Sequence, residues 1–134
     1  MSFVSRRVFV VLLVTLLLTG CDLLGSDDPP RITGTYEGQI RMEGFTWTIR
    51  FALAETKNDV VTGSGWRSPV QFDAAVPFTI SGIYEPPNVT LTLESSDQPN
   101  VEIVGTISTD GSTLTGIMRD PNRTRELSLV RRRN

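Results

Sequence analysis

The chain has 134 residues, with 13 basic and 15 acidic side chains, one cysteine and no histidine. Without histidine, neither a Ser-His-Asp triad nor a cysteine–histidine pair can form, and zinc sites built on Cys and His ligands are excluded as well. The small negative net charge gives no electrostatic footprint for nucleic acid.

The first twenty residues have the pattern of a secretory signal. Arg6 and Arg7 precede an apolar run, residues 8–18, that only Thr15 interrupts. This run is too short for a transmembrane helix, which needs about twenty residues, and it has the length of a signal peptide core. We therefore predict a signal peptide over residues 1–20.

The signal ends in a motif that resembles the lipobox of bacterial lipoproteins, formed by Leu18, Thr19 and Gly20 in front of Cys21. The resemblance implies cleavage before Cys21, diacylglycerol on its thiol and a further acyl chain, such as palmitate, on its amine. Two or three chains anchor firmly, because each buried methylene contributes about 0.8 kcal/mol. We therefore expect a lipid-anchored protein of the bacterial cell envelope. The alternative is an ordinary signal, or a signal anchor, with a coincidental cysteine.

Two features near the signal bear on export. Residues 5–10 resemble the twin-arginine motif, but the strongly apolar run favours the general secretory route. Asp22 follows Cys21 directly, which resembles an inner-membrane retention signal of enteric bacteria. That rule does not hold in all bacteria, so the choice between inner and outer membrane stays open.

Residues 21–30 form the predicted lipidated N-terminus and tether. The segment is rich in Gly, Ser, Asp and Pro, which disfavour helix and sheet. The nine residues after Cys21, residues 22–30, reach at most about 30 Å, so we expect the domain to lie close to the membrane. Without the signal, 11 basic and 15 acidic side chains remain, a net charge of about −4. Residues 31–134 suffice for one domain.

From residue 31 onward the apolar pattern has a period of two, which is typical of strands. In residues 45–53 an aromatic or aliphatic residue alternates with a small or polar one. In residues 32–40 the predicted inward face holds three large apolar or aromatic residues and two glycines, Ile32, Gly34, Tyr36, Gly38 and Ile40. The turn at Glu43 and Gly44 between them predicts a hairpin. Residues 68–76 are irregular, either a loop or a strand. Further strands are predicted over 60–66, 78–84, 89–94, 101–107, 114–119 and 126–131.

These eight short strands predict an all-β domain. Glycines recur inside the strands and supply the bends that closing a small barrel requires. Consecutive hairpins favour an antiparallel up-and-down barrel, with a β-sandwich as the alternative. Ile83, Val104 and Ile117 are predicted to face outward, which indicates either a two-layer fold or a surface that packs on a partner.

Residues 32–38 resemble the opening strand of the calycin superfamily, which includes lipocalins and carries Gly-x-Trp there. This chain has Tyr36 at the tryptophan position. The resemblance implies a lipocalin-like barrel in which an arginine of the last strand lies across the first-strand aromatic residue and closes one end. Arg131 is the candidate for that role, because it shares the parity of Leu127 and Leu129.

Two functions are compatible with such a barrel. The first is binding of a small apolar ligand by aromatic residues with polar groups inside the barrel. The second is interaction with an envelope protein, including protease-inhibitor-like modules, in which case the aromatic residues only fill the core. The candidate ligand-binding residues are Tyr36, Trp47, Phe51, Trp66 and Tyr84, with Phe78 nearby.

We predict no enzymatic activity, no catalytic residues, no metal site and no cofactor. The carboxylates lie mostly in turns or on outward strand faces, so no acid–base pair in unlike environments is evident. The turns at Asp110 and Asp120 lack the ligand spacing of calcium loops. Residues 131–133, three consecutive arginines, are either a solvated tail or a contact for phosphate or lipid headgroups.

Overall fold

The computed structural model describes residues 28–133. The predicted signal peptide (1–20), the lipobox residues Leu18, Thr19 and Gly20, the lipidation site Cys21 and tether residues 22–27 lie outside the described residues.

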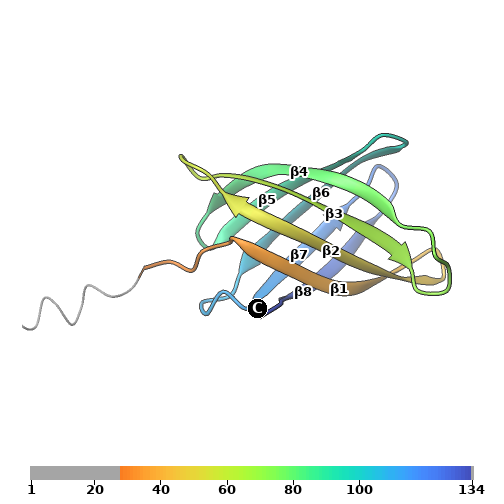
Figure 1. Cartoon of the computed structure of the whole chain (residues 1–134), viewed down its shortest axis with the longest axis horizontal. Helices are drawn as coiled ribbons and strands as arrows, with labels where there is room; N and C mark the ends of the chain where they lie inside the picture. Colours follow the sequence, from red (N-terminus) through yellow and green to blue (C-terminus); the bar gives the residue numbers. More distant parts are fainter. Residues whose placement is uncertain (1–27, 134) are drawn as a thin grey trace, which may run out of the picture.

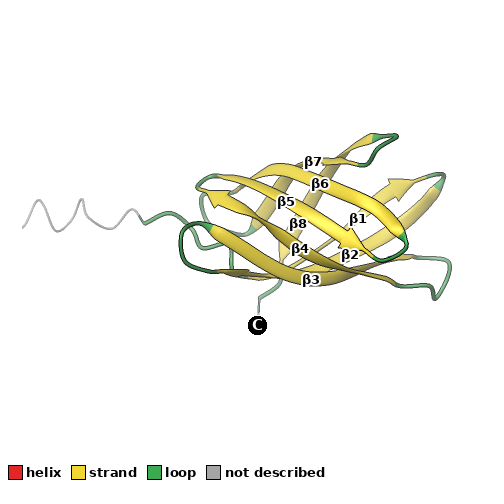
Figure 2. Cartoon of the chain, turned by 90° about the horizontal axis from the view of Figure 1, so that it is seen from above, coloured by secondary structure: helices red, strands yellow, loops and turns green. Residues whose placement is uncertain are grey.

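Eight antiparallel strands form the described part of the chain (Figure 1). Each strand pairs with the next one in sequence, and β8 pairs with β1, which closes the sheet into a barrel (Figure 2). The predicted up-and-down barrel is therefore confirmed, and the sandwich alternative is wrong. The strands are β1 (Gly34–Met42), β2 (Phe45–Glu55), β3 (Val60–Pro69), β4 (Val76–Glu85), β5 (Asn88–Ser95), β6 (Gln98–Ile107), β7 (Thr113–Arg119) and β8 (Thr124–Arg131).

The closing seam between β1 and β8 is short. Tyr36 is the register partner of Arg131, and Glu37 is the partner of Val130. One backbone hydrogen bond extends the seam beyond β8, because the Arg132 amide donates to the Thr35 carbonyl at 2.8 Å. This pairing closes the sheet into a barrel, and closure is how barrels avoid edge-to-edge association.

The irregular segment before β4 is resolved as a loop. Strand β3 continues past its predicted end to Pro69, and residues 70–75 then connect it to β4. The Val70 amide donates to the Thr46 carbonyl at 2.8 Å, so the loop begins against the start of β2. The alternative of a strand through these residues does not hold.

The barrel interior is filled by side chains. Inward residues near its middle have no solvent-exposed area. A cavity large enough for a water molecule would expose part of the side chains that line it, so these side chains leave no such cavity between them. Aromatic rings continue this packing: the ring centroids of Tyr36 and Phe51 lie 6.0 Å apart in a tilted arrangement, and those of Phe51 and Phe78 lie 6.3 Å apart, edge to face. Fully buried residues include Ile49, Leu91, Ile103, Leu114 and Leu129.

Because the number of strands is even, the chain enters and leaves the barrel at the same end. We call the end where the chain enters and leaves the tether end, and the opposite end the distal end. The tether end holds residues 30–33, the connections 56–59, 86–87 and 108–112, and residues 132–133. The distal end holds the turn 43–44, the loop 70–75, the turn 96–97 and the turn 120–123.

Candidate functional site

Two of the predicted ligand-binding residues, Tyr36 and Tyr84, lie at the tether end and hold the entering chain. The Tyr36 hydroxyl donates to the Ile32 carbonyl at 2.8 Å, and the Tyr84 hydroxyl donates to the Pro30 carbonyl at 2.7 Å. Both rings are buried, and this burial raises the pKa of each phenol. Their polar groups are therefore occupied by the backbone of the entering segment.

Arg131 completes the closure of the tether end. Its Nη1 donates to the Arg31 carbonyl at 3.1 Å, and its guanidinium lies so close to Gly34 that a side chain there would overlap it. Because Arg131 is also the register partner of Tyr36, the structure brings together the two residues that the calycin resemblance pairs.

The other three candidates do not share a cavity with these tyrosines. Phe51 lies in the hydrophobic core, and Trp47 is partly buried near the distal end and packs on the core. Trp66 is on the outer surface, 36% exposed, so its predicted inward position is wrong. The cause is strand parity: Val61 and Arg67 point inward, and Trp66 alternates with them.

The predicted outward apolar residues do lie on the outer surface. Ile83, Val104 and Ile117 are between 43 and 53% exposed. They lie in one cross-strand line, since Ile83 and Val104 both pair with Thr90, and Val104 pairs with Ile117. We call these three residues the side-wall row.

A second exposed apolar group lies on one side of the rim of the distal end, around β2, β3 and the loop that follows β3. Phe45, Trp66, Val70 and Phe72 are between 36 and 58% exposed, and the rings of Phe45 and Phe72 meet edge to face with centroids 5.9 Å apart. Trp66 and Phe72 border a hollow of about 420 Å³. We call these four residues the rim patch. The sequence offered one signal for it, the apolar residues inside an otherwise polar loop.

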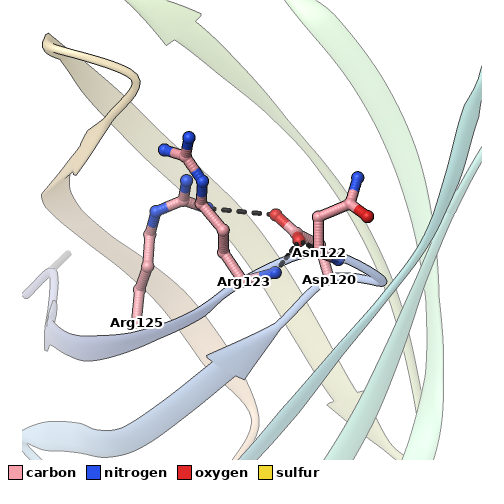
Figure 3. A network of polar contacts seen from close by, with 4 residues as sticks. All are labelled: Asp120, Asn122, Arg123 and Arg125. Carbon is pink, nitrogen blue, oxygen red and sulfur yellow. Dashed lines mark hydrogen bonds and ion pairs between the residues drawn. The ribbon is translucent and has the colours of Figure 1, made fainter.

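The opening at the distal end contains charged side chains. Arg125 Nη1 and Asp120 Oδ2 form an ion pair at 3.0 Å (Figure 3). Asp120 Oδ1 accepts the backbone amides of Asn122 at 2.9 Å and Arg123 at 2.7 Å. Burial raises the pKa of Asp120, but these donors outweigh it and hold the pKa below its usual value.

These residues belong to a pocket of about 430 Å³ that also includes Glu43, Arg67 and Gln98. We call it the distal mouth. Arg67 lies in the mouth with its Cζ 6.0 Å from the ring centroid of Trp47, a cation–π arrangement. Sequence reasoning missed this site, because Arg67 falls after the predicted end of its strand.

The C-terminal arginines are not all a solvated tail. Arg131 belongs to β8, and Arg132 Nη1 lies 3.4 Å from Glu37 Oε2. All three border a pocket of about 500 Å³ at the tether end together with Asp110. Hydrogen bonds from Ser108 and Ser112 lower the pKa of Asp110 to about 2, so its carboxylate organises the turn.

Within residues 28–133, no helix is long and apolar enough to cross a membrane. The same residues contain no group of three or more acidic, histidine or cysteine side chains able to hold a metal ion. No protein family model, curated protein or solved structure matches this chain.

Proposed function

We propose that this chain is a lipid-anchored protein of the bacterial cell envelope that binds another protein through the distal end of its barrel. The rim patch is the observation that carries the proposal. Soluble surfaces seldom gather large apolar side chains without a binding role, and aromatic residues and arginine are the residue types enriched where proteins bind each other. The rim patch and the distal mouth offer both kinds at one end.

The direction of the tether supports this choice. In the proposed mature protein, Cys21 carries acyl chains, and at most about 30 Å of chain separates it from Pro30. The Tyr84 hydroxyl fixes Pro30 to the tether end, so that end faces the bilayer. A strand of eleven residues such as β2 is about 35 Å long, and the rim patch therefore points away from the membrane toward other envelope proteins.

The filled interior favours this function over transport of a small apolar ligand. The inward rings of Tyr36, Phe51 and Tyr84 are at most 3% exposed, so a ligand inside the barrel would have to displace core side chains. Overpacking a well-packed core costs about 1–3 kcal/mol even for a few added methylenes. A binding partner at the distal end requires no such rearrangement.

The proposal can be tested by site-specific photo-crosslinking in the full chain. A photoreactive phenylalanine analogue replaces Phe72 in the rim patch, and a matched probe replaces Ile83 in the side-wall row. We expect one discrete protein adduct from position 72 and none from position 83. A lipid adduct at position 72, or a protein adduct from position 83 alone, would contradict the proposal.

The crosslinked partner is then purified and its affinity for the barrel measured. Phe72→Ala and Trp66→Ala should each weaken binding by about tenfold or more, the loss expected of a central aromatic contact. Ile83→Thr serves as the control and should leave the affinity within about twofold. Equal affinities for all three variants would exclude the rim patch as the binding surface.

A further inference from the structure

Arg67 carries a positive charge inside the distal mouth that no acidic side chain neutralises directly. Its Nε is buried and has no hydrogen-bond partner among residues 28–133. Neither ion pair found in this part of the chain includes Arg67. Arg67 is partly buried, and this partial burial lowers its pKa. A buried donor such as its Nε ordinarily has a hydrogen-bond partner, because leaving it unpaired is costly.

The carboxylate of Asp120, whose charge acts on Arg67, already accepts hydrogen bonds from other donors. Asp120 accepts two backbone amides on Oδ1 and the Arg125 guanidinium on Oδ2. These bonds fix the carboxylate within its own turn, as Figure 3 shows. Arg67 therefore has a neighbouring negative charge but no acceptor of its own.

The remaining charges of the mouth leave an excess of positive charge. Arg67, Arg123 and Arg125 line the pocket with only Glu43 and Asp120 opposite them. Figure 3 shows the side chains of Arg123, in the β7–β8 turn, and Arg125, at the start of β8, extending in the same direction. Planar guanidinium groups match carboxylate and phosphate oxygens, which they bind through paired hydrogen bonds.

We propose that the distal mouth is a binding site for a small oxyanion, a carboxylate or phosphate group, that pairs with Arg67 and is completed at the rim by Arg123. The pocket of about 430 Å³ is within the size range of small-molecule sites. The site does not depend on the proposed protein partner, since a free anion satisfies it equally well.

The test uses sodium phosphate and sodium acetate as separate probes, with ionic strength held constant by sodium chloride. Because the buried core extends from Ile32 to Leu129, a chain of residues 22–134 contains the whole barrel. Trp66→Phe in this chain leaves Trp47, which contacts Arg67, as the sole tryptophan reporter. We expect a saturable change in Trp47 fluorescence with at least one probe, and the probe that saturates at lower concentration identifies the preferred oxyanion.

Arg67→Gln should weaken the response by about tenfold or more, which corresponds to the loss of a charge-assisted contact. Arg123→Gln changes an exposed residue and should weaken it by about threefold, so the proposal stays testable if Arg67→Gln fails to fold. Arg41→Gln, on an exposed position of β1, is the matched control and should bind as the parent does. A linear response to both probes, or equal affinity of the Arg123→Gln and Arg41→Gln variants, would overturn the proposal.

Discussion

Tyr36 and Tyr84 have two structural roles at the tether end, one for the ring and one for the hydroxyl. Each ring fills the core, and each hydroxyl satisfies a carbonyl of the entering segment, of Ile32 and Pro30 respectively. Buried carbonyls need such donors, because an unpaired buried polar group costs about 1–3 kcal/mol. The polar groups that suggested a ligand site therefore have a structural role.

Removing these hydroxyls should lower the free energy of unfolding. Tyr84→Phe deletes one hydrogen bond and should cost about 1 kcal/mol, whereas Tyr36→Phe leaves the buried Ile32 carbonyl unpaired and should cost about 1–3 kcal/mol. Urea unfolding followed by circular dichroism measures both. Trp66→Phe, on the surface, is the control and should stay within about 0.5 kcal/mol of the parent. Unchanged stability of both tyrosine variants would show that the hydroxyls do not secure the entering segment.

At the scale of single strands, β3 explains where sequence reasoning failed. Its inward positions hold Gly63, Gly65 and Arg67, while Val60 and Trp66 face outward. The apolar pattern therefore indicates that the face with Trp66 points inward, which is wrong. The true inward face could not be recognised from hydrophobicity, because glycine has no side chain. In β2 the inward face is mostly apolar, and there the predicted parity is correct.

The inward glycines of β3 let it approach β2 closely. A Cβ at Gly65 would overlap the Arg50 carbonyl and lie 2.5 Å from the Phe51 Cβ. Gly65→Ala should therefore destabilise the barrel by about 1–3 kcal/mol, as overpacking does. Ser64→Ala, on the adjacent outward position, is the matched control and should change stability by less than about 0.5 kcal/mol. Equal thermal midpoints for the two variants would show that β2 and β3 tolerate a wider separation.

At the scale of the whole molecule, the strand alternation and hairpin turns sufficed to predict the barrel. They could not predict the distal mouth, whose residues come from two turns and two strand ends. The Glu43 turn, the end of β3 at Arg67, the start of β6 at Gln98 and the turn after Asp120 meet only once the sheet closes. The order of the strands predicts which connections lie at the same end of the barrel. The side chains that enter the opening depend instead on the residue at which each strand ends, and the sequence pattern does not fix that residue.

The attachment of the whole molecule can be tested at the proposed lipidation site. Cys21→Ser should abolish attachment through acyl chains, because none can be added, and should leave a protein that is either unprocessed or soluble. Cell fractionation and mass spectrometry of the N-terminus measure this, and Ser26→Ala in the predicted tether is the control that should remain attached. Unchanged membrane retention together with unchanged processing of Cys21→Ser would contradict a lipid anchor.

The hydrogen bond from Tyr84 to Pro30 has a mechanical consequence. In the proposed lipid-anchored protein, it places the membrane attachment at one end of the strands, and the surface proposed to hold a partner lies at the other end. Tension between the membrane and that partner then acts along the barrel axis. It pulls β1 parallel to β2 and β8, so the hydrogen bonds between these strands are strained in shear. Many bonds must yield together under such a load, whereas a sideways pull would open them one after another.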